Sequence, residues 1–348
     1  MNKQTEPLVS VIMPVFNSQG FLEQAVHSIL AQTHKNFELI IVDDGSKDAS
    51  WDIATKLGKT DGRIHLIQLG KNQGISTTCN TGLKIAKGKY IARMDADDVS
   101  LPDRLSLQVK FMEAHPDIGV LGGGMRYMAE SGELLGIPPQ FFGDLAIRWN
   151  LLFETPFFHP TVILRKSILD AYGLQYDPSY ARGAEDYELW SRLLPVTKGE
   201  NLQDTVLYYR LHPNSNTHRH VNLEYENVIN ISARAIKSCL PGAAVSLQEV
   251  VDLQKALIGE LPLEKRQRAR RIQVYFKIWD EFRRTHAGNT DLPRLVTDAI
   301  AWAARMILYP PFQPDALHAL LFLTKKDWRW PFYLLRNIPY YVARRQIG

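Results

Sequence analysis

Short apolar runs alternate with helix-patterned segments along the first 120 residues, and this alternation constrains the fold more than any other feature of the sequence. The runs at 9–15 (VSVIMPV) and 37–42 (FELIIV) are rich in β-branched residues and nearly continuous, as expected of strands covered on both faces. Further strands are expected at 64–69 and 89–94, and helices at 21–32, 49–59 and 75–86. The alternation predicts a mostly parallel α/β sheet flanked by helices.

The chain after residue 100 is expected to be mixed at first and helical later. Helices are predicted at 101–115, near 144–153 and at 185–194, strands at 118–121, 161–164 and 205–211, and a bend at Gly122–Gly124. Beyond about residue 222 the pattern is helical throughout. We therefore expect an α/β domain over residues 1–221 and an α-helical C-terminal region over residues 222–348.

Composition excludes several classes of protein. Hydrophobic residues make up 45% of the chain and charged residues 22%, which is typical of globular and not of disordered proteins. The two cysteines, Cys79 and Cys239, lie too far apart for a disulfide framework or a cysteine-rich zinc site. No stretch of about 18 uncharged apolar residues exists and no signal-peptide layout is present, so we expect a cytoplasmic protein without a membrane span.

The net charge of +4 conceals an asymmetry along the chain. Residues 262–348 carry 16 basic and 7 acidic side chains, a balance of +9. The region begins with four arginines expected to form a cationic patch and continues with aromatic residues among lysines and arginines: Arg266, Arg268, Arg270 and Arg271, then Trp302, Tyr309, Trp328, Trp330, Phe332, Tyr333, Tyr340 and Tyr341. This composition suits peripheral attachment to an anionic membrane surface. The alternative is a helical subdomain with a solvated basic face, and no recognised motif supports binding of nucleic acid.

Polar and acidic residues follow each of the first four predicted strands. Because parallel strands end at the same edge of a sheet, these loops are expected to meet there, where open α/β sheets bind ligands. The strongest local signal is the run Asp95-Ala96-Asp97-Asp98, since three carboxylates in four residues repel each other in a dry interior. They could converge on Mg²⁺ or Mn²⁺ that bridges a diphosphate. The alternative is a solvated acidic turn before the next helix.

Two further acidic pairs admit a functional and a structural interpretation. Asp43 and Asp44, in the run DDGS, could recognise a base and ribose, or they could belong to an ordinary strand-to-helix turn. Glu185 and Asp186 could supply a general base that deprotonates an acceptor hydroxyl, or they could cap a helix. His212 follows a predicted strand and could reach the same cation as Asp98, although a lone histidine is more often a packing residue.

Taken together, in order and spacing, these segments resemble the family 2 glycosyltransferases with the GT-A fold. The resemblance covers about residues 7–216. The matching segments are VSVIMPVFN (9–17), SILAQTHKNFELIIVDDGSKDAS (28–50), NQGISTTCNTGL (72–83), KGKYIARMDADDVSLPDRL (87–105), HPTVILRKSIL (159–169), GAEDYELWSRL (183–193) and YYRLHPNS (208–215).

The resemblance implies a role for particular residues. The nucleoside and donor sugar are then held by the loop of Pro14, Val15 and Asn17, by Asp44 together with Asp43, and by Arg93, Asp95 and Asp97. The metal motif is formed by Asp97 and Asp98 and is completed by His212. Asp186 matches the catalytic base, with Glu185 as the second candidate.

The activity implied is inverting, metal-dependent sugar transfer from a UDP- or dTDP-sugar to a saccharide acceptor, in surface polysaccharide biosynthesis. A lipid-linked acceptor at the inner face of the cell membrane would explain the basic C-terminal region. The processive members of the family carry a Gln-x-x-Arg-Trp motif and membrane spans, and this chain has neither. The alternative is a non-catalytic nucleotide-sugar or carbohydrate-binding protein on the same scaffold. A dinucleotide-binding dehydrogenase is excluded, because the first predicted strand is not followed by Gly-x-Gly-x-x-Gly.

Overall fold

The computed structural model describes residues 6–180, 183–213, 221–257, 265–292 and residue 295. The chain divides into two compact units. The first unit holds the residues up to Ile147 together with Thr155–Asn227. The second unit holds Arg148–Glu154 and the described residues from Val228 onward. Every residue predicted above to bind donor or metal, or to act as the base, belongs to the first unit.

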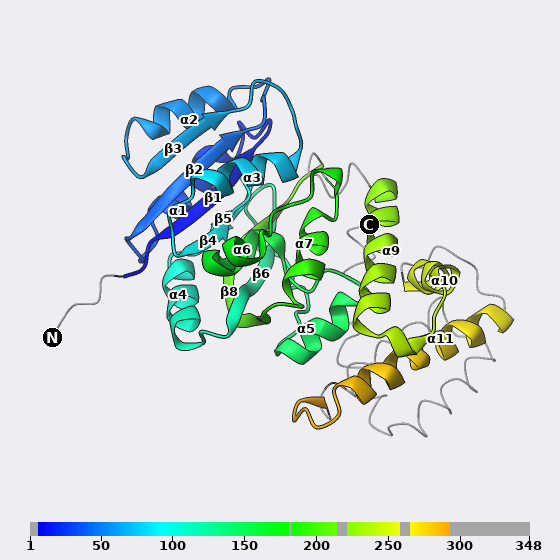
Figure 1. The fold of residues 1–348 in the computed structure, drawn as a ribbon. Coiled ribbons are helices and arrows are strands. Elements are labelled where there is room, and N and C mark those ends of the chain that lie inside the picture. The colour runs from blue at the N-terminus through cyan, green and yellow to red at the C-terminus, as the bar shows by residue number, and fades with distance from the viewer. Residues whose placement is uncertain (1–5, 181–182, 214–220, 258–264, 293–294, 296–348) are drawn as a thin grey trace. The chain divides into compact units, whose positions relative to one another are not determined.

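An eight-stranded sheet forms the centre of the first unit, in the order β3-β2-β1-β4-β7-β6-β8-β5 (Figure 1). Its strands are β1 (Val9–Val15), β2 (Phe37–Asp43), β3 (Ile64–Gln68), β4 (Tyr90–Arg93), β5 (Val99–Ser100), β6 (Ile118–Ala129), β7 (Ile163–Arg165) and β8 (Lys198–Leu211). Its helices are α1 (Leu22–Leu30), α2 (Ser50–Gly58), α3 (Ile75–Ile85), α4 (Arg104–Ala114), α6 (Lys166–Tyr172) and α7 (Glu185–Leu193). The boundary between the units falls within α5 (Asp144–Leu151) and within α9 (Val221–Cys239).

The N-terminal half of the sheet is parallel. Strand β1 pairs in parallel with β2 and with β4, and β2 pairs in parallel with β3. The loops that follow these four strands therefore leave the sheet at one edge, as the sequence predicts. The other half is mixed, because β7 runs antiparallel to both β4 and β6 while β6 and β8 are parallel. The predicted α/β class is confirmed.

Both faces of the parallel strands are covered, which explains why their sequences do not alternate with polar residues. On one face, Val11 and Met13 of β1 belong to a buried apolar cluster with residues of α1, α2 and α4. On the other face, Ile12 packs against Gly82 of α3. Burying apolar side chains on both faces stabilises the sheet by roughly 25 cal/mol for each Å² removed from water. The result is a rigid platform below the loops.

The predicted bend at Gly122–Gly124 is wrong, because these glycines lie inside strand β6. Their pairing with β8 shifts register around Gly122 and Gly124. A Cβ atom on Gly122 would meet Asn201 Oδ1 at 1.9 Å, and one on Gly123 would meet Val206 at 2.5 Å. The glycines therefore let the two strands pack closely at an irregular pairing, and they do not turn the chain.

Aromatic rings form the core of the second unit, which contains α10 (Leu247–Leu257) and α11 (Lys265–Thr285). Trp149 is fully buried, and its ring makes edge contacts at 5.0–5.5 Å with four others: Phe153, Tyr275, Trp279 and Phe282. Such contacts add about 0.5–1.5 kcal/mol per pair to the burial of the rings.

None of the described helices is long and apolar enough to cross a bilayer.

The cationic patch predicted at the start of the basic region needs one correction. Arg270 is exposed and lies 3.9 Å from Glu249, but Arg271 is buried, with 5% of its surface exposed. Burial also lowers the pKa of Arg271. Arg271 therefore cannot belong to an exposed patch. The aromatic residues predicted for a membrane surface, from Trp302 to Tyr341, lie outside the described residues.

Candidate active site

The loops after β1 and β2 are joined by reciprocal hydrogen bonds. The Asn17 backbone N–H donates to Ser46 Oγ at 3.0 Å, and the Lys47 N–H donates to Asn17 Oδ1 at 2.7 Å. Asn17 is exposed and has a φ of +51°, whereas Pro14 and Val15 are buried within β1. Of the predicted nucleoside loop, only the Asn17 end therefore presents its side chain at the edge of the sheet.

Asp44 and Asp43 have different partners. The Asp44 carboxylate accepts backbone N–H groups from Gln73 at 2.7 Å and Gly74 at 2.9 Å, so it fixes the loop after β3. Burial nevertheless raises the pKa of Asp44. Asp43 is fully buried, and its Oδ2 accepts the Ser46 N–H at 3.2 Å. Asp43 Oδ1 is buried and has no hydrogen-bond partner among the described residues.

Gly45, in the loop after β2, lies against the loop after β3. Its replacement by alanine is expected to destabilise the protein. Its φ is +72°, and a Cβ atom would lie 2.6 Å from the Lys71 Cα. Gly70 also has a positive φ, of +67°, but a Cβ there meets nothing within 4 Å, so Gly70→Ala is the matched control. We expect Gly70→Ala to cost about 1 kcal/mol of unfolding free energy and Gly45→Ala at least about 2 kcal/mol more. Urea unfolding would measure both, and equal losses would contradict the close approach of Lys71.

Three carboxylates converge after β4. One oxygen each of Asp95, Asp97 and Asp98 can be chosen so that all three lie within 4.8 Å of one another. The Arg93 guanidinium of β4 is paired with Asp95. His212 Nε2 lies 2.9 Å from Asp97 Oδ2, which places this histidine beside the cluster as a partner of Asp97.

Arg210 holds the acidic turn in place, and the sequence prediction did not assign it a role. Its backbone N–H donates to Asp98 Oδ1 at 2.9 Å, and its Nε donates to the Asp97 carbonyl oxygen at 2.8 Å. The same guanidinium donates to Gln24 Oε1 and lies over the Phe21 ring, 4.8 Å from its centroid. Its position two residues before His212 was the available signal, but only the fold shows which groups it contacts.

The chemistry of this cluster fits a hard divalent cation. Asp98 is 1% exposed, and its Oδ2 has no hydrogen-bond partner among the described residues. Burial, and then the charges of Asp97 and Asp95, raise the pKa of Asp98 well above its usual range. Burial likewise raises the pKa of Asp95, although Arg93 opposes the shift. Mg²⁺ or Mn²⁺ would take oxygen ligands from Asp97 and Asp98 and offset this repulsion.

The two acids at the start of α7 are held by different groups. Asp186 Oδ2 accepts the Thr155 hydroxyl at 3.1 Å, and its Oδ1 accepts the Tyr187 backbone N–H at 2.7 Å. Glu185 Oε1 lies 3.4 Å from His159 Nδ1. Burial raises the pKa of both acids. No pattern in the sequence indicates a role for Thr155, which lies 31 positions before Asp186 in the chain.

The acids after β4 and the acids of α7 belong to one electrostatic environment. The charge of Arg93 lowers the pKa of Glu185 and that of Asp95, and the charges of Asp95 and Asp186 both act to raise the pKa of His159. Coulombic effects of this kind need close charges with little intervening water. The fold thus brings together two clusters of carboxylates that lie about ninety residues apart in the sequence.

Comparison with known proteins identifies the family that this chain resembles. Residues 10–173 match the family model described as Glycosyl transferase family 2. An uncharacterized glycosyltransferase of Haemophilus influenzae is 30% identical over 276 residues, which cover 72% of this chain and 82% of the relative. The UDP-Glc:alpha-D-GlcNAc-diphosphoundecaprenol beta-1,3-glucosyltransferase WfaP of Escherichia coli is 34% identical over 215 residues, covering 60% of this chain and 79% of WfaP.

Two solved structures share the fold. TarS 1–349 of S. aureus, in complex with UDP-GlcNAc, matches with a TM-score of 0.56 at 19% identity, over 92% of this chain and 88% of that chain. The mannosyltransferase PcManGT from Pyrobaculum calidifontis, in complex with GDP-Man and Mn²⁺, matches with a TM-score of 0.52 at 15% identity, over 94% and 88%. These likenesses confirm the predicted GT-A fold.

Proposed function

This chain belongs to glycosyl transferase family 2, and we propose that it transfers a sugar from a UDP- or dTDP-sugar to a saccharide acceptor with inversion at the anomeric carbon. The observation that carries the proposal is the pairing of two acidic clusters in one environment. Asp95, Asp97 and Asp98 form one cluster, Glu185 and Asp186 form the other, and Arg93 lowers the pKa of a member of each. A single displacement needs two separate groups of this kind. The leaving diphosphate needs its negative charge stabilised, whereas the attacking hydroxyl needs a base that takes its proton.

On the donor side, the chain's own residues bind and orient the nucleotide. Asn17 lies exposed at the edge of the sheet where a nucleoside would be held, and Asp43, which ends β2 beside it, has one buried oxygen without a partner among the described residues. Asp97 and Asp98, with His212 beside them, would hold Mg²⁺ or Mn²⁺. When bound, such a cation supplies Lewis-acid stabilisation of the negative charge on the diphosphate. PcManGT, which was solved with GDP-Man and Mn²⁺, supports this assignment.

On the acceptor side, Asp186 is the proposed general base. The acceptor hydroxyl oxygen forms the new bond to the anomeric carbon as the bond from that carbon to the diphosphate oxygen breaks. The hydroxyl proton passes to the Asp186 carboxylate, and the nucleoside diphosphate departs with the bonding electrons. Burial raises the pKa of Asp186, which makes its carboxylate a better proton acceptor. Thr155 and the Tyr187 amide hold its oxygens in a fixed orientation.

The proposed pathway is the assembly of a surface polysaccharide on a lipid-linked saccharide. The printed name of WfaP specifies a UDP-Glc donor and a diphosphoundecaprenol-linked acceptor, and this relative supports the choice. The test is a donor screen with UDP-, dTDP- and GDP-sugars, with and without a polyprenyl-diphosphate-linked sugar. We expect one donor to give nucleoside-diphosphate release that depends on acceptor and Mn²⁺ and stops with EDTA. Tight binding of a donor without turnover under any condition would instead favour the non-catalytic alternative.

We further propose a cytoplasmic location with peripheral attachment to the inner face of the cell membrane. The +9 charge of residues 262–348 supports this placement. The full chain is expected to sediment with vesicles containing 30% phosphatidylglycerol and to be released by about 0.5 M salt, because exposed charges are screened at that ionic strength. Pure phosphatidylcholine vesicles are the control. Equal sedimentation with both vesicles, or with neither, would contradict electrostatic attachment.

A further inference from the structure

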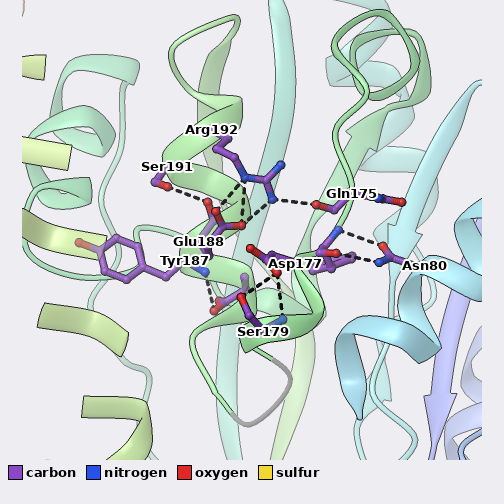
Figure 2. Close-up of polar contacts among 10 residues, drawn as sticks. Asn80, Gln175, Asp177, Ser179, Tyr187, Glu188, Ser191 and Arg192 are labelled. Atoms are coloured by element: carbon purple, nitrogen blue, oxygen red, sulfur yellow. Dashed lines mark hydrogen bonds and ion pairs between the residues drawn. The ribbon is translucent and has the colours of Figure 1, made fainter. Parts of the chain in front are cut away.

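A buried asparagine joins helix α3 to the segment before α7. Asn80 Nδ2 donates to the Tyr176 carbonyl oxygen at 2.7 Å, and the Tyr176 N–H donates to Asn80 Oδ1 at 2.9 Å. Figure 2 shows the Asn80 side chain directed at the segment that carries Gln175 and Asp177. Asn80 and Tyr176 are both buried. The side chain thus satisfies both backbone groups of one residue, which fixes the position of Tyr176 relative to the parallel sheet.

Helix α7 holds the same segment from its other side. Arg192 Nη2 donates to the Gln175 carbonyl oxygen at 2.7 Å, while Arg192 Nε donates to Glu188 Oε1 at 2.8 Å (Figure 2). Glu188 is 2% exposed, so this ion pair is shielded from solvent on one side. The segment before α7 is therefore fastened both to α3 and to α7.

From this fixed segment, Tyr176 reaches His159. The Tyr176 hydroxyl lies 2.8 Å from His159 Nε2, and His159 Nδ1 lies 3.4 Å from Glu185 Oε1. If Nδ1 carried no proton, it and the ionised carboxylate of Glu185 would both be hydrogen-bond acceptors, and they would repel each other. The charge of Glu185 therefore favours the tautomer with the proton on Nδ1, which leaves Nε2 to accept the Tyr176 O–H.

The start of α7 needs such support. Ala184 has a φ of +64°, a left-handed conformation that is unfavourable for a residue with a Cβ atom, and Gly183 before it has a φ of +134°. The Gly183 carbonyl oxygen accepts a hydrogen bond from Asn227 Nδ2 at 3.0 Å. A strained turn of this kind persists only where surrounding contacts determine it, and it directs the first side chains of α7, Glu185 and Asp186.

We propose that Asn80, Tyr176 and His159 form a positioning chain that acts through Glu185 to hold the first turn of α7, and with it Asp186, in the orientation needed for proton abstraction. This inference rests on the proposed function, in which Asp186 is the base. Tyr176 and His159 are positioning residues, because Tyr176 contacts Asn80 and His159, and His159 contacts Glu185, so both act on Asp186 only through other groups. Their role is to fix a geometry, since a displacement of about 1 Å can cost about 10²-fold in rate.

The charges around His159 agree with a fixed neutral ring. His159 faces Glu185 and Asp186 of α7, Arg93 of β4, and Asp95 after β4. Burial, followed by the positive charge of Arg93, lowers the pKa of His159 to about 3. The ring is therefore uncharged through the pH range in which histidines usually titrate, and it is not itself an acid or base in the reaction.

Conservative variants separate positioning from simple structural support. His159→Asn keeps an amide near the place of Nδ1, whereas His159→Gln extends its amide toward Nε2. Tyr176→Phe removes only the hydroxyl and leaves the backbone contacts with Asn80. We expect kcat to fall about 100-fold for His159→Gln, which loses the contact with Glu185, and about tenfold for both Tyr176→Phe and His159→Asn, which lose only the contact between the tyrosine hydroxyl and Nε2, with KM for the donor unchanged. Tyr172→Phe, at an exposed tyrosine of α6, is the control and should retain full activity.

A second measurement does not depend on turnover. In full-length protein labelled with ¹⁵N-histidine, the His159 ring should show a protonated Nδ1 and a bare Nε2 that do not titrate between pH 5 and 8. The His159→Asn variant assigns the signal, and Tyr176→Phe should shift the Nε2 resonance. A protonated Nε2, a normal titration, or wild-type kcat in both Tyr176→Phe and His159→Gln would overturn the positioning chain. A correct tautomer in a protein that turns over no donor would instead contradict the proposed function.

Discussion

Asp98→Asn is expected to abolish sugar transfer and to make the metal-free protein more stable. Asp98 is almost fully buried beside Asp95 and Asp97, so its charge is costly unless a cation offsets it. Asparagine keeps an oxygen for the Arg210 N–H but removes one negative charge. Without the carboxylate the cation is bound weakly, and we expect kcat/KM to fall by about 10³-fold.

The measurement combines activity with thermal unfolding. In EDTA, Asp98→Asn should melt at a higher temperature than the wild type. Added Mn²⁺ should raise the melting temperature of the wild type only, because a ligand of the folded state stabilises it by mass action. Asp103→Asn replaces an exposed aspartate five positions later and is the control for both readings. An active Asp98→Asn variant, or one that Mn²⁺ stabilises as much as the wild type, would contradict the assignment.

The same group gives a pH dependence of known sign. Burial raises the pKa of Asp98 in the folded protein above its unfolded value of 3.8, so the folded state retains a proton that the unfolded state has lost. The contribution of Asp98 to the free energy of unfolding is therefore fully present below pH 3.8, and it is lost as the pH rises through the raised pKa that Asp98 has in the folded protein. In EDTA, the stability advantage of Asp98→Asn should therefore grow as the pH is raised from 4.5 to 8.

Asp186→Asn is expected to lower kcat by about 10²- to 10⁴-fold while leaving donor binding unchanged. Asparagine preserves the size of the side chain and an oxygen for the Tyr187 N–H, but it cannot accept the proton of the acceptor hydroxyl. Steady-state kinetics and calorimetric titration with UDP and Mn²⁺ separate the two effects. In the wild type, the rate should fall at low pH through an aspartate pKa that burial has raised.

Two further variants are needed to interpret the effect of Asp186→Asn on kcat. Asp170→Asn changes an exposed carboxylate that pairs with Lys166 and should have wild-type kinetics. Glu185→Gln should cost about tenfold, as expected for the loss of a positioning contact. If Glu185→Gln abolished transfer and Asp186→Asn did not, the base would be Glu185, and the assignment made here would be wrong.

The sequence predicts the parallel half of the fold well because the signals there are local. Strand β1 is predicted with its observed bounds, and β2 to within one residue, since continuous apolar runs mark strands covered on both faces. The second half depends on distant pairing. Strand β8 begins at Lys198 and not at residue 205, because its polar first half is paired with β6 in spite of its composition.

In the candidate site, too, the local features are visible in the sequence and the contacts between distant segments are not. Runs of acids such as 95–98 and 185–186 are visible in the sequence, because clustered carboxylates are unusual in a folded interior. The groups that orient them are not visible. Arg210, Thr155 and Tyr176 are common residue types whose roles arise only when β8, the segment before η1 (His159–Thr161) and the segment before α7 meet the acids in space.

The most direct test of the two-cluster account is an anomalous diffraction measurement on crystals of the full chain soaked with the identified donor and MnCl₂. We expect a manganese peak within coordination distance of Asp97 and Asp98, in contact with the diphosphate, and the anomeric carbon on the side of Asp186. A bound nucleotide whose manganese lies elsewhere, or whose sugar points away from α7, would contradict it.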